Sequence, residues 1–324
     1  MLACTLTLVK GQNPQFSQFY AMPLLLNPAF TGQSLEHRIA ADVRDQWPGV
    51  ATTYRTMAAS YDYNVSSLNS GIGLLVLRDN SGTPALNTTL ALLSYAYHFN
   101  INRNVEIRAG AQLGAGNKSI DMSKLVFNDQ LYYNSGATGD PFAININNHV
   151  TYMDINMGAV INSLTYWGGF SAQHINKPNT SFNEDGNNYQ PVNISVHGGY
   201  RFVKSKKRDR LLEYFSPCFN YKHEANFDQL DLGAYYVKAP LTFGLWYRGL
   251  PLKHYAPGYW NADAATFLLG VDVSSAMRIG LSYDVTISRL TITKSLGALE
   301  FSLIYEYAKR NKRTRRILIS CPKF

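Results

Sequence analysis

The stretch that decides the fold is residues 278–287, which read RIGLSYDVTI. Apolar side chains occupy every second position from Ile279 to Ile287, and polar or small residues lie between them. Residues 299–307, LEFSLIYEY, repeat the pattern. Because successive side chains of a β-strand point to opposite faces, both stretches predict strands with one apolar and one polar face. Each apolar row spans about nine to eleven residues, the length of a tilted strand that crosses a bilayer.

The same alternation recurs along the chain and predicts about fourteen strands between residues 36 and 308. The predicted strands are 36–46, 52–63, 69–79, 86–99, 103–115, 150–161, 164–175, 191–203, 209–221, 226–237, 240–249, 263–273, 276–288 and 297–308.

The connections between these strands alternate in length. Short turns are expected at 100–102, 162–163, 237–239 and 274–275, whereas long segments are expected at 116–149, 176–190 and 250–262. Outer-membrane barrels have short turns on the periplasmic side and longer loops outside. With an even number of strands, this asymmetry places both termini in the periplasm.

Composition is compatible with a membrane barrel. The chain has 324 residues, of which 46% are hydrophobic and 13% aromatic, and no apolar run reaches the roughly 18 residues of a membrane helix. Tyrosine and phenylalanine gather at one end of alternate strands, as in the interfacial girdle of a barrel. A soluble β-sandwich also alternates but does not explain this distribution. The predicted fold is therefore all-β: a transmembrane up-and-down antiparallel β-barrel in the outer membrane, covering residues 36–308.

Three segments lie outside the predicted barrel. Residues 1–11 look like the apolar remnant of a secretory signal peptide. Residues 309–324 are expected to form a basic C-terminal tail in the periplasm. This tail would contact anionic lipid head groups or an acidic periplasmic partner, or it would be surrounded by solvent alone.

Residues 12–35 contain three prolines, which exclude a central strand, and a large apolar load. We expect a short helix from Pro14 to about Ala21, and we expect the whole segment to plug the periplasmic side of the barrel; a disordered leader is the alternative. The residues expected to form the plug are Pro14, Phe16, Phe19, Tyr20, Asn27, Pro28 and Phe30.

Signatures of catalysis are weak. The seven histidines show no metal-ligand spacing, and residues 114–119 only approximate a phosphate-binding loop because Asn117 replaces the required glycine. Charged residues on the polar strand faces carry both signs. We therefore expect no catalytic residue, no metal and no cofactor, and the net charge of +8 gives no reason to expect nucleic-acid binding.

Several motifs together resemble one family. They are NPQFSQFY at 13–20, NPAFTG at 27–32, RDQWPG at 44–49, QLDLG at 229–233, GLWYRG at 244–249, RIGLSYDVT at 278–286 and CPKF at 321–324. In this order they resemble the PorP/SprF family of type IX secretion system outer-membrane proteins.

This resemblance implies a non-enzymatic barrel that works with other type IX secretion components. It would support export or surface attachment of a secreted protein, such as a gliding or cell-surface adhesin substrate, by receiving that protein's C-terminal targeting domain at the extracellular mouth. The alternative function is a diffusion channel for small solutes.

Two groups of residues are candidates for contacts with partners. Aromatic residues of the outer loops would bind the substrate, unless they form an outer girdle or pack between loops: Trp47 with Pro48, Tyr132 with Tyr133, and Tyr255 with Trp260. The last strand carries Glu300, Ser302, Tyr305 and Tyr307 in a pattern similar to the signal read by the outer-membrane barrel assembly machinery.

Overall fold

The computed structural model describes residues 13–34, 36–50, 54–82, 86–102, 104–126, 130–131, 147–183, 186–207, 210–256, 259–288 and 292–307. The predicted signal remnant, the basic tail, Tyr132 and Tyr133 lie outside these residues.

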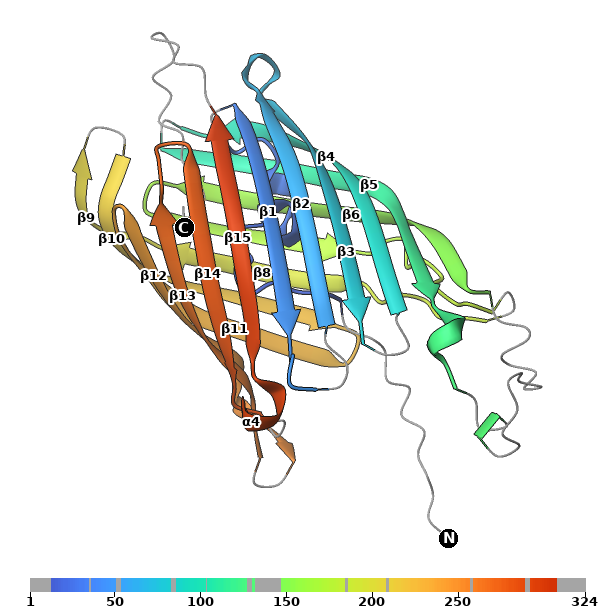
Figure 1. The fold of residues 1–324 in the computed structure, drawn as a ribbon. Coiled ribbons are helices and arrows are strands. Elements are labelled where there is room, and N and C mark those ends of the chain that lie inside the picture. Colours follow the sequence, from blue (N-terminus) through green and yellow to red (C-terminus); the bar gives the residue numbers. More distant parts are fainter. Residues whose placement is uncertain are drawn as a thin grey trace.

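The strands form one closed antiparallel barrel (Figure 1). The sheet contains 15 strand segments, and because β8 and β9 are successive parts of one crossing, the barrel has 14 strands, as predicted. The first strand closes the ring by pairing with the last along its whole length, from His37 opposite Tyr307 to Gln46 opposite Ala298. The segments are β1 (His37–Gln46), β2 (Tyr54–Val65), β3 (Ser70–Ser81), β4 (Leu86–Asn100), β5 (Val105–Ile120), β6 (His149–Ser163), β7 (Tyr166–Gln173), β8 (Asn193–Tyr200), β9 (Phe202–Lys207), β10 (Arg210–Glu224), β11 (Phe227–Lys238), β12 (Leu241–Ala256), β13 (Tyr259–Asp272), β14 (Met277–Thr286) and β15 (Ala298–Tyr307).

Helical structure is confined to short pieces. They are α1 (Pro23–Leu26), η1 (Pro28–Phe30), η2 (Ser66–Leu68), η3 (Met122–Lys124) and α4 (Ile292–Ser295). None of the helices among the described residues is long and apolar enough to span a membrane.

The two faces of the wall differ as the alternation predicts. In β15, Leu299 and Phe301 are about half exposed, whereas Glu300 and Ser302 between them are buried. A β-sandwich would bury its apolar face in a core; here the apolar face is the outer one. Exposed aromatics mark one end of alternate strands, as expected of a girdle: Tyr61, Tyr95, Tyr97, Phe99, Tyr200, Phe202, Tyr236, Tyr305 and Tyr307.

The two ends of the barrel carry different connections. Connections of two to four residues join β2 to β3, β4 to β5, β6 to β7, β9 to β10, β11 to β12 and β13 to β14 at one end, called the short-turn end. At the opposite end, called the long-loop end, 28 residues separate β5 from β6 and 19 separate β7 from β8. Tyr307, the last described residue, lies at the short-turn end.

One predicted long loop is wrong. Residues 250–262 were expected to form an open loop, but β12 continues to Ala256 and β13 begins at Tyr259, with ladder irregularities from Gly249 onward. Gly249 has a φ of +143°, a conformation open to glycine, and Pro251 lies in the irregular stretch where the regular ladder is interrupted. The hairpin therefore extends beyond the predicted strands, and it contains Tyr255 and Trp260.

A charged side chain on the outer face should lower the free energy of unfolding by an amount that depends on its depth in the membrane. We expect Leu281→Arg, near the middle of β14, to cost about 2–4 kcal/mol, and Ile287→Arg, in the same outward row but past the strand end, to cost about 0–1 kcal/mol. Both residues are 45% exposed, so the pair is matched for accessibility. Folding titrations into lipid vesicles measure both values. Equal penalties would show that the two positions do not differ in depth.

Candidate functional site in the barrel lumen

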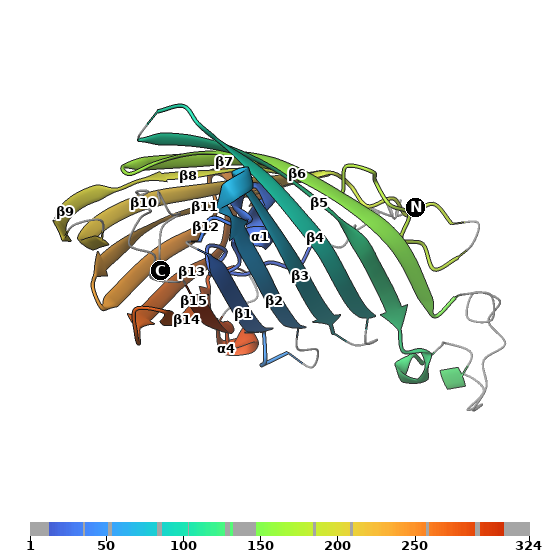
Figure 2. The ribbon, with the colours of Figure 1, turned by 90° about the horizontal axis from the view of Figure 1, so that it is seen from above.

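The candidate site is the interior of the barrel, which contains residues 13–34, called the N-terminal segment below. Figure 2 shows α1 of this segment inside the ring of strands. Its first residue, Asn13, lies at the long-loop end, where its side chain contacts His174 Nε2 at 2.8 Å and accepts from Gln190 Nε2 at 2.7 Å. Its last residue, Ser34, lies at the short-turn end, where its carbonyl accepts from Asn64 Nδ2 at 3.0 Å.

This path corrects the expected position of the segment. Residues 12–35 were expected to lie in the half of the lumen next to the short turns, but the contacts of residues 13–34 run along both halves. Gln15 Oε1 accepts from Lys222 and Gln229, which flank the β10–β11 turn at the long-loop end. The first and last described residues, Asn13 and Tyr307, thus lie at opposite ends of the barrel, and the periplasmic location of both termini stays a prediction.

Glu300 of β15 is the main anchor of the segment. Its carboxylate accepts from the backbone N–H groups of Ser17 and Gln18, both at 2.7 Å, and from Arg44 Nη1 at 3.0 Å. Ser302, two residues further along the same face, donates to Gln18 Oε1 at 2.7 Å. The predicted helix from Pro14 is wrong because these amides bind the barrel wall, and the first helix begins only at Pro23.

Two arginines and two aspartates complete the network around Ser17. Ser17 Oγ donates to Asp284 Oδ2 at 2.6 Å and accepts from Arg44 Nη1 at 2.6 Å and Arg248 Nη2 at 2.9 Å. Arg248 also pairs with Asp231 at 3.0 Å and with Asp284 at 3.3 Å. The charged groups are almost fully buried. A buried ion network is stable only when its charges are paired and hydrogen-bonded, and the Ser17 hydroxyl bonds directly to three of its members.

Aromatic packing holds the next residues. Phe19 lies edge-on to Trp246 of β12, with ring centroids 4.9 Å apart, and Tyr20 lies edge-on to Trp167 of β7 at the same distance. Tyr235 of β11 packs at 6.0 Å from Tyr20. These side chains are all buried, so three separate strands contribute apolar contacts to one point of the segment.

Barrel side chains donate to the carbonyl groups of the second half of the segment. Arg108 bonds to the carbonyls of Ala29 at 3.0 Å and Thr31 at 2.7 Å. Further carbonyls of residues 24, 25 and 26 accept from Gln112, Gln173 and Ser171. The wall therefore supplies hydrogen-bond donors to these carbonyls, in a segment whose own helical structure is limited to the short α1 and η1.

Asn27 and Gly32 fit positions that few other residues could occupy. The Asn27 side chain accepts from Ala29 N at 2.9 Å and donates to Phe170 O at 2.9 Å, so it caps η1 and binds β7 at once. Gly32 has a φ of +68°, and a Cβ atom on it would lie 2.5 Å from the Cα of Gly71 in β3. The segment thus passes over the wall at van der Waals distance.

The expected plug residues lie together in this segment. Phe16, Phe19, Tyr20, Asn27, Pro28 and Phe30 are buried, and Pro14 is partly buried. Sequence reasoning did not single out Ser17 and Gln18, whose backbone amides bind the Glu300 carboxylate, although both lie inside the NPQFSQFY motif.

The four residues of the predicted assembly signal divide between two faces. Glu300 and Ser302 are buried and contact the N-terminal segment, whereas Tyr305 and Tyr307 are exposed on the outer face. Recognition by the assembly machinery stays a prediction.

The candidate loop residues lie at the long-loop end. Trp47 N donates to Gly297 O at 2.8 Å, and its ring meets Tyr54 edge-on at 5.6 Å, while Pro48 is exposed. The backbones of Tyr255 and Trp260 belong to β12 and β13. Substrate binding by these residues stays a prediction.

Charged groups of the interior pair with one another. Within the described part of the chain, no group of three or more His, Cys, Asp or Glu residues is arranged to hold a metal ion. The charged groups of the interior also bind the N-terminal segment, so the arrangement positions a peptide inside a barrel.

Solved structures similar to this chain are outer-membrane barrels. The CymD monoaromatic hydrocarbon channel has 13% identity and a TM-score of 0.50, covering 90% of this chain and 94% of that one. The Pseudomonas putida toluene transporter TodX has 10% identity and a TM-score of 0.49, covering 90% and 93%. Omp33 of Acinetobacter baumannii has 8% identity and a TM-score of 0.46, covering 86% and 100%. At these identities the likeness concerns the fold alone. No curated protein matches the chain.

The closed barrel with its apolar outer face defines the class: an outer-membrane β-barrel. A family model described as the type IX secretion system membrane protein PorP/SprF matches residues 8–305, nearly the whole chain. The chain therefore belongs to the PorP/SprF family.

Loss of the Glu300 charge should loosen the N-terminal segment. We expect Glu300→Gln to lower the free energy of unfolding by about 3–5 kcal/mol. Arg44 loses a buried charged partner, and an NH₂ group takes the place of one of the two oxygens that accept from the backbone amides of Ser17 and Gln18. Hydrogen exchange of residues 16–22 in the reconstituted protein should then accelerate. As a control, Asp45→Asn breaks the exposed pair with Arg55, which contributes about 0–1 kcal/mol. Unchanged exchange at 16–22 in Glu300→Gln would show that this network does not hold the segment.

Proposed function

We propose that this barrel supports the export or surface attachment of a protein secreted by the type IX system, such as a gliding or cell-surface adhesin substrate. It would bind that protein's C-terminal targeting domain at its long-loop end, which would face outward, with the short-turn end in the periplasm. The family match supports a role in type IX secretion with other secretion components. The observation that carries the receptor proposal is the buried N-terminal segment, which occupies the space that a pore would need.

Under this proposal the protein acts without catalysis. The N-terminal segment is a plug, held by aromatic packing and by hydrogen bonds to charged and polar side chains of the surrounding strands. The binding surface is then the long-loop end, where loops can vary in sequence while the strands below them stay fixed. Trp47 with Pro48, and the extended β12–β13 hairpin, belong to that surface.

The second candidate function is a diffusion channel. The likeness to CymD favours only the barrel fold, since the identity is 13%. A channel requires a continuous polar path, and the buried cluster of Phe19, Tyr20, Trp167 and Trp246 opposes one.

Conductance in planar bilayers separates the two functions. We expect little ion current through the wild-type barrel, and a larger current through a variant in which the signal sequence joins directly to Pro23, because that variant lacks Ser17 to Met22 and their contacts. Circular dichroism should verify that the variant retains its strands. A large current through the wild-type protein would support the channel and contradict the plug.

Exchange of loops tests the binding surface. Replacing residues 121–148 and 250–262 with those of a relative that serves a different substrate should transfer export or surface retention to that substrate. The matched control replaces the short turn at 101–104 and should change nothing. If substrate choice instead followed the N-terminal segment or the basic tail, the long-loop end would not be the recognition surface.

A further inference from the structure

One strand edge at the short-turn end is unpaired. Among the described residues, β9 pairs only with β10, from Phe202 opposite Phe215 to Lys207 opposite Arg210, and it is the terminal segment in the order of the sheet. The preceding part of the same crossing, β8, is paired on both sides, with β7 and with β10. The wall therefore loses one neighbour where β8 gives way to β9, and about 20 Å of backbone presents N–H and C=O groups to the outside.

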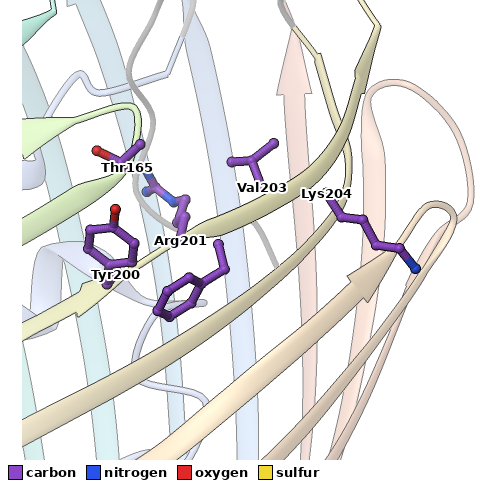
Figure 3. A pocket seen from close by; sticks show the side chains of 6 residues that line it. Thr165, Tyr200, Arg201, Val203 and Lys204 are labelled. Atoms are coloured by element: carbon purple, nitrogen blue, oxygen red, sulfur yellow. The ribbon is translucent and has the colours of Figure 1, made fainter.

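Arg201 fixes the point at which the neighbouring strand stops. Its backbone N–H donates to Thr165 O at 2.6 Å, and its guanidinium donates to the carbonyls of Ser163 and Leu164 at 3.0 and 3.2 Å. These bonds hold the β6–β7 turn at the start of β9, so β7 cannot extend alongside it. A hollow remains in the place of the missing strand, lined by Thr165, Tyr200, Arg201, Phe202, Val203 and Lys204 (Figure 3).

The unpaired edge also indicates its depth in the membrane. Unpaired backbone groups are not tolerated in hydrocarbon, so β9 must lie in the interfacial layer or beyond it. With the short-turn end in the periplasm, as the proposed function has it, the edge is open to periplasmic proteins.

The charge of this region restricts what can pair with it. Residues 201–213 contain six basic residues and two acidic ones, and one of the acidic residues, Glu213, is held by Lys204 at 2.8 Å. A second copy of β9 would bring the same charge, and the chain's own residues 309–324 are also basic. Like charges on adjacent strands are destabilising, which leaves an acidic strand as the complement.

We propose that the free edge of β9 is a docking site for an extended, acidic segment of a periplasmic protein, which adds a strand beside Phe202–Lys207. Backbone hydrogen bonds to the edge supply affinity, and alternate side chains of the added strand supply specificity. One face of that strand meets Phe202 and the other meets Val203, which are 57% and 38% exposed, and a carboxylate on the Phe202 side lies next to the exposed Lys204.

The test uses the full-length protein in nanodiscs and a synthetic peptide of alternating glutamate and valine. Fluorescence polarisation measures binding, and hydrogen exchange measures protection. We expect the peptide to slow exchange at residues 202–207 but not in β11, which is paired on both sides. Lys204→Glu with Lys206→Glu should weaken binding about tenfold. The matched control is Lys238→Glu, a charge reversal at the same end of the barrel on a fully paired strand, and it should weaken binding far less.

Three outcomes would overturn the proposal. Equal binding of a lysine-valine peptide would show that charge does not select the partner. Binding without protection of residues 202–207 would show that no strand is added. Vesicles of phosphatidylglycerol that protect 202–207 and displace the peptide would assign the edge to lipid head groups. None of these results depends on the long-loop end, so they are independent of the receptor function.

Discussion

The hydrogen bonds from two successive backbone amides, Ser17 and Gln18, to the carboxylate of Glu300 join the barrel wall to the segment inside it. That carboxylate also neutralises Arg44, and Ser17 in turn binds Asp284 and Arg248. Without the segment these buried charges would lose the hydroxyl that lies between them, and without the charges the segment would lose partners for its backbone. A buried ion network that loses a member is strongly destabilised, so we expect the wall and the N-terminal segment to depend on each other for stability.

Under the plug proposal, this dependence explains how a barrel can have many charged interior positions without being an open pore. The charges around Ser17 bind one another and the N-terminal segment, and the aromatic side chains of Phe19 and Tyr20 fill the space beside them. Recognition would then occur at the two ends. Loops form the surface at the long-loop end, whereas the free edge of β9 is the feature of the short-turn end that could bind a partner.

The strands could be predicted because side-chain alternation has a local cause, but the interior could not. Regular rows such as Ile279 to Ile287 give both the strand and its faces. The hairpin beyond Gly249 was missed because an irregular ladder accommodates Pro251, which in a regular strand would end the pairing. The helix expected at Pro14 was wrong because the backbone amides of Ser17 and Gln18 bind the carboxylate of Glu300. That residue lies 283 positions from Ser17 and 282 from Gln18 in the sequence. Likewise Glu300 was interpreted as an assembly signal, since nothing local reveals a contact with the N-terminus.

Labelling of single cysteines would test most directly whether the N-terminal segment runs through the lumen to the long-loop end. In a background without the native cysteines, Asn13→Cys is compared with Pro48→Cys at the long-loop end and Leu68→Cys at the short-turn end, using a membrane-impermeant maleimide on intact and permeabilised cells. We expect Asn13→Cys to react from the same side of the membrane as Pro48→Cys. Reaction from the side of Leu68→Cys would contradict a segment that passes through the whole barrel.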